Sequence, residues 1–350
     1  MKKILCLALS LVMVFSLAAC GGSAAASAPA EAPAAKEEEA APAATKDAKD
    51  LHIALVGGET SSEWYIQVEK GINEYASETG INATFHGPAT SDPTETVTLV
   101  KDLISQGVDA LIINVDCQDA VESALKDARE KGILVISTEG TGMTNRDYDV
   151  EPTNNEYYGQ FMMQCLAKQM GEKGTYVVMV GDLTSTAHNA WADAAIEYQK
   201  ANYPDMELID ERLESQVNAE VAYERAKEIL KKYPDLGGIL GCSSFDPLGA
   251  SKAVKELGLD CKVFGNGTML TDEEVLKDGT LEAITFWDPA LTAKAMCNLA
   301  VKVLTEGKDV VKDGIDLGYE GYDKCVLDGP CIYGAALVYG TVDNFDQYPF

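Results

Sequence analysis

Short apolar runs alternate with amphipathic stretches along most of this chain, beginning near residue 51. The first run, 51–56, is rich in β-branched residues, stops at two glycines and is typical of a buried strand. A polar segment, 59–62, comes next, and from Trp64 onward apolar residues recur at helical spacing. The folded part therefore begins with a strand, a polar loop and a helix, the first half of a βαβ unit.

The same alternation continues for more than two hundred residues. Further strands are predicted at 81–85, 109–115, 133–137, 175–180, 206–211, 238–240, 262–264 and 281–286. Helices are predicted at 92–106, 119–130, 153–170, 188–201, 218–232, 247–257 and 291–305. Strands that alternate with helices predict parallel sheets whose two faces are covered by helices.

The pattern occurs twice with nearly the same spacing, so we predict two similar lobes. Trp64 and Trp191 lie 127 residues apart, each just inside a helix. Glu139 and Asn266 are also 127 residues apart, and each closes a fourth strand. The prediction is an α/β fold of two doubly wound parallel-sheet lobes, joined by several crossing strands that act as a hinge.

The lobe boundaries follow from where the second copy begins and from the expected return of the last long helix to the first lobe. The expected ranges are 51–152 with about 289–317 for the first lobe, and 153–288 with about 318–350 for the second.

The first 50 residues have a different character. A basic start, Met1 to Lys3, precedes an apolar run at 4–19, which is short for a membrane span and suits an export signal. Residues 21–50 are mainly Ala, Pro, Glu, Lys and Ser, without aromatic or branched aliphatic side chains, and are expected to form a disordered tether.

The end of the export signal, Leu17-Ala18-Ala19-Cys20-Gly21, resembles the lipobox of bacterial lipoproteins. The resemblance implies that residues 1–19 are removed and that Cys20 is lipidated, because two or more acyl chains anchor a protein stably. The alternative is an ordinary secretory signal with a chance cysteine.

Charge and cysteine content narrow the function. The formal net charge is −28, and loss of Lys2 and Lys3 with the leader makes it −30, which argues against nucleic acid or an anionic membrane surface as partner. Three scattered histidines are too few for a histidine-rich metal site. The seven cysteines after Cys20 form no CxxC pair and suit small buried hydrophobes, although Cys325 and Cys331 could bridge a turn.

Motifs for catalysis are missing from the sequence. There is no GxSxG elbow, HExxH zinc motif or phosphate-binding P-loop, and Gly265-Asn266-Gly267 lacks the third glycine of a dinucleotide site. We therefore expect no enzyme and no cofactor.

Six short motifs stand in a characteristic order and spacing along the chain: Ile53–Val56, Trp64-Tyr65, Gln106–Ile113, Gly132–Ile136, Thr285–Asp288 and Tyr348–Phe350. In these motifs the chain resembles the type I periplasmic-binding-protein family, the substrate-binding components of ABC importers, and within it the branch that binds ribose, rhamnose and autoinducer-2. The resemblance covers about 51–350.

The resemblance implies a sugar-type cleft. Trp64-Tyr65 match the family's aromatic pair that stacks on a sugar ring, and Glu139 occupies the position of a hydroxyl-binding aspartate. Ser243-Ser244 occupy the position of a polar pair, and Trp287-Asp288 match a motif near the hinge. Ribose binders carry Arg where this chain has Gly140, so the identity of the sugar stays open.

The residue types suit a sugar. Aromatic rings offer flat apolar area for the C–H faces, and carboxylates accept hydroxyl protons. The expected ring contacts are Trp64, Tyr65, Trp191 and Trp287. The expected acids are Asp116, Glu139 and Asp288. Other predicted contacts are Ser62, His188, Asn189, Ser243, Ser244 and Asn266. Each has a structural alternative, such as packing for the rings and helix capping for Asp116 and Asp288.

No Lys or Arg falls at a predicted strand end, which disfavours an anionic ligand and leaves a cationic one open. The favoured function is a lipid-anchored, extracytoplasmic and monomeric binding protein that delivers a monosaccharide or related polyol to an ABC permease in the membrane. A ligand-sensing receptor that presents to a membrane sensor is the alternative, and an enzyme is the least favoured.

Overall fold

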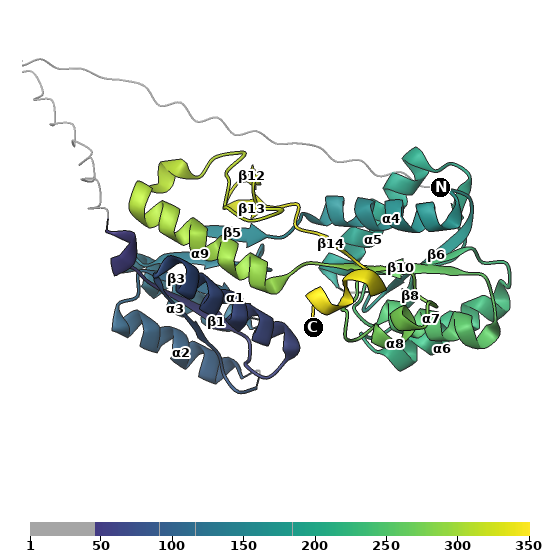
Figure 1. The fold of residues 1–350 in the computed structure, drawn as a ribbon, viewed down its shortest axis with the longest axis horizontal. Helices are drawn as coiled ribbons and strands as arrows, with labels where there is room; N and C mark the ends of the chain where they lie inside the picture. The colour runs from purple at the N-terminus through teal and green to yellow at the C-terminus, as the bar shows by residue number, and fades with distance from the viewer. Residues whose placement is uncertain (1–45, 91, 116, 184) are drawn as a thin grey trace, which may run out of the picture. The chain divides into compact units, whose positions relative to one another are not determined.

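The structure is a computed structural model that describes residues 46–350 except 91, 116 and 184 (Figure 1). The expected export signal, Cys20 and Asp116 lie outside the described residues, as does the expected tether up to residue 45. Of that tether the described end is ordered: Asp47 caps a short 3₁₀ helix, Ala48–Asp50, and Ala48 packs against the core of the first lobe.

The first lobe contains a seven-stranded sheet in the order β12-β13-β5-β4-β3-β1-β2. Its strands are β1 His52–Gly57, β2 Asn82–His86, β3 Ala110–Asn114, β4 Leu134–Ser137, β5 Tyr148–Glu151, β12 Val326–Asp328 and β13 Cys331–Tyr333. Its helices are α1 Glu63–Thr79, α2 Pro93–Gln106, α3 Gln118–Glu130 and α9 Pro289–Glu306. All pairings in this sheet are parallel except that between β12 and β13.

Strand β1 shows why this sheet is covered on both faces. Ile53 and Leu55 belong to the core beneath α1 and α9, whereas Ala54 and Val56 belong to the core beneath α2 and α3. Successive side chains of a strand point to opposite faces, so an unbroken apolar run supplies both cores. Figure 1 shows α9 beside α1, although they are separated by two hundred residues of chain.

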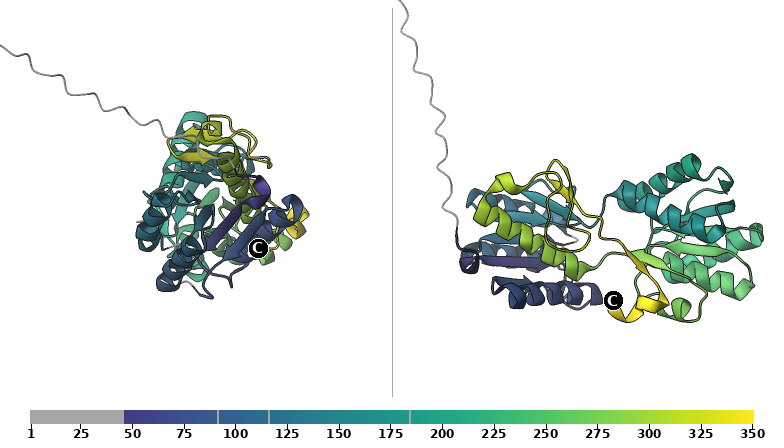
Figure 2. Two further views of the ribbon diagram at one scale, coloured as in Figure 1. Left: turned by 90° about the vertical axis from the view of Figure 1, so that its left-hand side faces the viewer. Right: turned by 45° about the horizontal axis from the view of Figure 1, so that its top comes forward.

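The second lobe repeats this three-layer arrangement around the order β10-β9-β6-β7, with β8 also paired to β6. Its strands are β6 Gly174–Val180, β7 Met206–Leu208, β8 Leu213–Glu214, β9 Gly238–Gly241 and β10 Lys262–Gly265. Its helices are α4 Asn155–Met170, α5 Thr186–Asn202, α6 Ala219–Lys232, α7 Asp246–Leu257 and α8 Glu273–Lys277. Helices α4 and α5 pack on one face, and α6 and α7 on the other (Figure 2). The predicted fold class is confirmed.

Within the described residues the chain passes between the lobes three times, which agrees with the expectation of more than one crossing. The crossings follow β5, β11 (Ile284–Phe286) and β13, and the last leads to β14 (Val338–Gly340), which pairs antiparallel with β11. The first and third crossings lie side by side, because Gly334 N donates to Glu151 O at 2.8 Å and Ala336 N donates to Pro152 O at 2.9 Å.

The C-terminal stretch differs from the expected boundaries. Residues from about 318 were expected in the second lobe, but β12 and β13 extend the first sheet, since β13 pairs in parallel with β5. The stretch from β14 onward lies with the second lobe: Phe350 is part of its core, and Phe345 of the closing 3₁₀ segment, Val342–Gln347, and Tyr348 pack against that core. The predicted strand at 206–211 is shorter than expected, since β7 ends at Leu208, and the short strand β8 begins only at Leu213.

The described cysteines are all free, so the bridge considered for Cys325 and Cys331 is not formed. Cys325 Sγ donates to Tyr322 O at 3.3 Å and Cys331 Sγ donates to Asp149 Oδ2 at 3.8 Å. Across residues 46–350, apart from the three gaps, no helix has the length and apolar character that a membrane crossing needs. The same residues contain no group of three metal-ligating side chains.

Candidate ligand-binding site

A cavity of about 350 Å³ lies where residues of both lobes and of the crossing segments meet. Its wall is formed by Glu139, Thr141, Glu151, Pro152, Thr153, Asn155, Ala187, His188, Trp191, Trp287 and Tyr333. The wall therefore combines three aromatic rings, two carboxyl groups, a histidine and several hydroxyl and amide groups. A volume of this size suits one small polar molecule.

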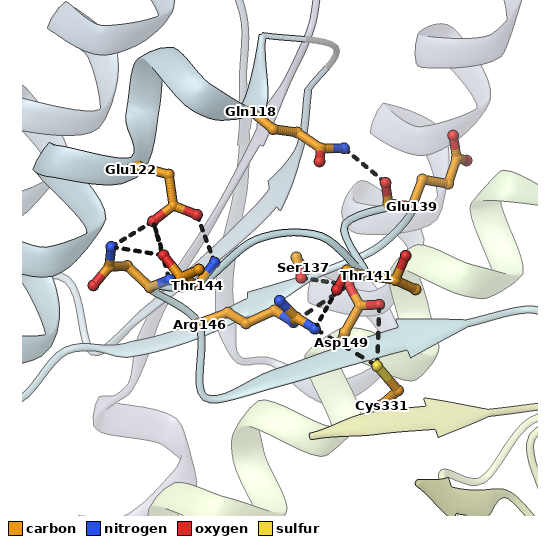
Figure 3. Close-up of polar contacts among 10 residues, drawn as sticks. Gln118, Glu122, Ser137, Glu139, Thr141, Thr144, Arg146, Asp149 and Cys331 are labelled. Atoms are coloured by element: carbon orange, nitrogen blue, oxygen red, sulfur yellow. Dashed lines mark hydrogen bonds and ion pairs between the residues drawn. The ribbon is translucent and has the colours of Figure 1, made fainter. Parts of the chain in front are cut away.

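The first-lobe wall is built by the loop that follows β4. Glu139 has a φ of +54°, a left-handed conformation that is uncommon for a residue other than glycine. Gln118 at the start of α3 holds this turn, since its Nε2 donates to Glu139 O at 2.7 Å (Figure 3). In the figure the Glu139 side chain points away from the polar cluster around Asp149. The turn thus places one carboxyl group at the cavity at a cost in backbone strain.

A buried polar cluster lies behind this wall. Asp149 is fully buried and accepts hydrogen bonds from Ser137 Oγ and Cys331 Sγ, and Arg146 Nε lies 4.0 Å from Asp149 Oδ1. Arg146 Nη2 also donates to Thr141 O at 2.9 Å (Figure 3). The guanidinium charge is therefore compensated by Asp149, and Arg146 supports the cavity wall without lining it.

Glu151, at the end of β5, lines the cavity and is only 8% exposed. Burial, followed by the charge of and hydrogen bond with Asp149, raises the pKa of Glu151 well above its ordinary value. Two carboxyl groups that share a hydrogen bond hold one proton between them. Among the described residues, Glu151 Oε1 has no hydrogen-bond partner.

The second-lobe wall comes from the first turns of α4 and α5. Trp191 is 8% exposed, and its Nε1 donates to Asn155 Oδ1 at 2.7 Å. The ring is fixed from behind by Tyr158, edge-to-face with a centroid distance of 4.7 Å. These contacts fix the orientation in which the indole meets the cavity.

His188 lies one turn before Trp191, with the two ring centroids 5.4 Å apart. Its Nδ1 accepts from Gly181 N at 3.3 Å, which leaves the ring proton on Nε2. Burial lowers the pKa of His188, so the neutral ring is favoured near pH 7. It can donate one hydrogen bond without contributing a positive charge.

Trp287, in the second crossing, joins the two halves of an aromatic cluster. Its ring lies edge-to-face with Trp64 at a centroid distance of 5.7 Å and with Tyr158 at 6.0 Å. Trp64 in turn contacts the C-terminal Phe350 at 5.8 Å. The rings on both sides limit the orientations open to the Trp287 indole.

Of the predicted contact residues, Glu139, His188, Trp191 and Trp287 line the cavity. Trp64 is not part of the wall and lies behind Trp287. Tyr65 was predicted as a ring contact with the ligand, but it is only 7% exposed and packs in the core of the first lobe. Its hydroxyl donates to Asn114 O at 3.2 Å.

The polar residues predicted at the second-lobe strand ends lie behind the cavity. Asn266 Oδ1 accepts from the Tyr158 hydroxyl at 2.7 Å, and Asn266 Nδ2 donates to Ser244 Oγ at 3.2 Å. Ser243 is fully buried, and its N–H donates to Asp246 Oδ2 at 2.8 Å. None of these three predicted residues lines the cavity. Asn266, held by Ser244, bonds to Tyr158, whose ring contacts Trp191 and Trp287.

Three further predicted residues lie at or near the starts of helices. Asp288 is the N-cap of α9, because its Oδ1 accepts from Ala290 N at 2.8 Å, and this capping role is the alternative to ligand contact named in the prediction. Burial raises the pKa of the Asp288 carboxyl. Ser62 is the N-cap position of α1 without a side-chain cap bond. Asn189 Nδ2 donates to Ser185 O at 2.8 Å and so holds the loop before α5. None of these residues is in the cavity wall.

The cavity wall also contains residues that were not predicted as contacts, among them Thr141, Glu151, Asn155 and Tyr333. Thr141 lies two residues after Glu139, and Asn155 follows the predicted start of α4, so a search around those positions would have found both. Glu151 and Tyr333 belong to strands β5 and β13, neither of which was predicted. Their short, partly polar sequences give little periodic signal.

A family model described as "Periplasmic binding protein domain" matches residues 53–309, which is most of the chain and includes every predicted βα unit up to α9. The chain belongs to this periplasmic-binding-protein family. The resemblance inferred from the sequence is thereby confirmed, and a binding protein, rather than an enzyme, is indicated.

Curated relatives are distant but cover most of both chains. The ribose import binding protein RbsB of Bacillus subtilis is 24% identical over 279 residues, covering 78% of this chain and 88% of the relative. A xylitol-binding protein of Mycolicibacterium smegmatis is 24% identical over 280 residues, covering 78% and 77%. The structure of a sugar ABC transporter protein from Actinomyces odontolyticus has a TM-score of 0.78 at 19% identity, covering 87% of this chain and all of the other, and supports the fold.

Proposed function

We propose that this periplasmic-binding-protein family member is the lipid-anchored, extracytoplasmic substrate-binding component of an ABC importer, and that it binds a monosaccharide or related small polyol in the cavity described above. The observation that carries the proposal is the composition of the wall: three aromatic rings and two carboxyl groups, with no Lys or Arg among the lining residues. The similarity to a ribose import protein and a xylitol-binding protein supports the same class of ligand.

The chemistry of the wall fits a polyhydroxylated molecule. Trp191, Trp287 and Tyr333 offer apolar ring area to C–H faces, while Glu139 and Glu151 offer hydrogen-bond acceptors to hydroxyl groups. His188 Nε2 and Asn155 supply further polar contacts. A sugar phosphate would meet two carboxyl groups and no compensating cation on the wall, so it would bind poorly.

The three crossing segments can couple ligand binding to the arrangement of the two lobes, which a permease would recognise. Pro152 and Thr153 in the first crossing and Trp287 in the second also line the cavity, and Tyr333 lines it from the end of β13, just before the third crossing. A ligand that contacts both lobes and their connections favours the arrangement in which all its contacts are made. A membrane permease can then recognise the ligand-bound arrangement.

A thermal-shift screen of the chain from residue 21 onward tests the proposal, with pentoses, hexoses, deoxysugars, pentitols and autoinducer-2 as candidates. A ligand present at a hundred times its Kd should stabilise the fold by about 2.7 kcal/mol and raise Tm by several degrees. Mass analysis of the incubated ligand should show no turnover. If no sugar or polyol raises Tm or gives a heat of binding, the proposed function is wrong.

The membrane anchor is a separate part of the proposal and rests on the sequence Leu17–Gly21. Cells that express the full chain should incorporate labelled palmitate into it, and Cys20→Ala should abolish both the labelling and membrane association. Labelling that survives Cys20→Ala would contradict the proposed anchor. Loss of ligand uptake after deletion of the gene, with sensing of the ligand unchanged, would support import over signalling.

A further inference from the structure

Among the residues that the structure describes, one buried cation and two buried carboxyl groups lie together at the first-lobe wall of the cavity. Arg146 and Glu151 are each 8% exposed, and Asp149 is fully buried. Arg146 Nε lies 4.0 Å from Asp149 Oδ1, and its Nη2 donates to Thr141 O at 2.9 Å. The guanidinium charge is therefore balanced by one carboxylate, and a second ionised carboxyl group would be buried without compensation.

The contacts of the two carboxyl groups indicate which of them holds a proton. Asp149 accepts hydrogen bonds from Ser137 Oγ and Cys331 Sγ. These donors and the ion pair with Arg146 stabilise its anion. Glu151 Oε1, in contrast, is buried and has no donor within the described chain. An O–H group on Glu151 that donates to Asp149 removes the orphaned acceptor, whereas an ionised Glu151 would keep it.

The electrostatic surroundings of Glu151 agree with this distribution. Burial is the largest cause of the raised pKa of Glu151, and the neighbouring carboxyl group of Asp149 acts in the same direction. No Lys or Arg is among the residues that line the cavity, and burial lowers the pKa of His188 on the opposite wall. The cavity side thus supplies no positive charge that would draw the proton away from Glu151.

The first sheet fixes Glu151 at the cavity. Glu151 ends β5 and is paired with Tyr333 at the end of β13, and its main-chain oxygen accepts from Gly334 N at 2.8 Å. Glu151 and Tyr333 both line the cavity. A ligand that fills this space removes the remaining water from Glu151, and a neutral carboxyl group loses far less hydration free energy than an ionised one.

We propose that Glu151 contacts the ligand as a neutral carboxylic acid, with its O–H group donating to Asp149 and its carbonyl oxygen accepting from a hydroxyl group of the ligand. The inference rests on the proposed function, because it assumes that this cavity holds a sugar or polyol. It goes further by assigning Glu151 a protonation state and a role: the residue recognises an uncharged donor through an uncharged acceptor.

Two substitutions of Glu151 separate the neutral form from the ionised one. The amide of Gln has the shape of the protonated acid, with an NH₂ group that donates to Asp149 and a carbonyl oxygen that accepts from the ligand. In isothermal titration at pH 7 with the tightest neutral ligand of the screen, Glu151→Gln should bind within threefold of wild type. Glu151→Ala should bind at least ten times more weakly. A larger loss in Glu151→Gln at wild-type Tm, or wild-type affinity in Glu151→Ala, would overturn the inference.

Infrared difference spectroscopy at pH 7 detects the proton itself, since the carbonyl stretch of a protonated carboxyl group lies apart from the bands of carboxylates. The wild type should show such a band that is missing from Glu151→Gln. Addition of the ligand should shift the band, which a purely structural role of Glu151 would not cause. Glu139→Gln is the matched control, because it makes the same substitution on the same wall, and it should leave the band in place.

The remaining outcomes are also decisive. Absence of the band from the wild type, or a band that the ligand does not move, would overturn the assignment. If Glu151→Ala does not fold, the infrared spectra and the affinity of Glu151→Gln still carry the test. If no sugar or polyol binds, the proposed function is wrong and the inference falls with it. If a ligand binds but Glu151→Gln fails these criteria, the inference alone is wrong.

Discussion

Replacing Trp287 by Ala should weaken ligand binding more than any change to the neighbouring Trp64. Trp287 lines the cavity, whereas Trp64 lies behind it at a centroid distance of 5.7 Å. Large aromatic side chains bury about 200 Å², and a ligand on one ring face covers about a third of that area. At about 25 cal/mol per Å², this contact is worth about 1.6 kcal/mol, or about fifteenfold in Kd.

The measurement is isothermal titration with the tightest ligand of the sugar and polyol screen. Trp287→Phe keeps a ring face and should lose only about threefold, which is about 0.7 kcal/mol. Trp64→Phe is the matched control, since it trims a ring of the same cluster outside the wall, and its Kd should change less than threefold. Tm values of all three variants show whether the fold is preserved.

Two results would refute the reasoning. Trp287→Ala with wild-type affinity would mean that the ligand does not lie on this ring. Equal losses for Trp287→Ala and Trp64→Phe, with equal loss of Tm, would mean that the cluster acts through stability alone.

Three other predictions concern stability and the site. Burial raises the pKa of Asp246 to about 6, so this carboxyl ionises at a lower pH in the unfolded chain than in the folded one. The free energy of unfolding should therefore fall by about 3 kcal/mol as pH rises from about 4 to above 6. Urea unfolding of Asp246→Asn should show a smaller fall over that range, and an unchanged fall would contradict the burial argument. Gly159→Ala should destabilise the fold by about 1–3 kcal/mol, because its Cβ would lie 2.2 Å from Trp191 O, and should also weaken ligand binding; wild-type Tm and Kd would refute this. Thiol titration of the unfolded, unreduced chain should find Cys325 and Cys331 reactive, whereas two missing thiols would indicate a bridge.

The repeated βα pattern was enough to predict the two lobes, because an unbroken apolar strand followed by an amphipathic helix has few other structural solutions. Strands β1, β3 and β4 are such runs, buried along nearly their whole length. Strands β5, β12 and β13 are three or four residues long, and β5 includes Asp149 and Glu151. The pairing of β13 with β5 joins segments about 180 residues apart, which no local pattern reveals.

The site was predicted in part for a similar reason. Tyr65, Val68, Ile72 and Tyr75 occupy one face of α1 and are buried, so helical periodicity directs Tyr65 into the core while Trp64 lies about 100° around the helix. Because Trp64 and Tyr65 are adjacent on a helix, they point in different directions, and they could not both contact one ligand. Periodicity also cannot show that Glu151 is buried next to Asp149, since that contact depends on where the first crossing leaves the sheet.

A crystal structure of the chain with the tightest-binding member of the sugar and polyol screen tests the central claim most directly. The account predicts one ligand molecule in the cavity, with a ring face of Trp191 or Trp287 against it and a carboxyl oxygen of Glu139 or Glu151 within hydrogen-bond distance. A ligand bound elsewhere on the chain, with this cavity containing only water, would contradict it.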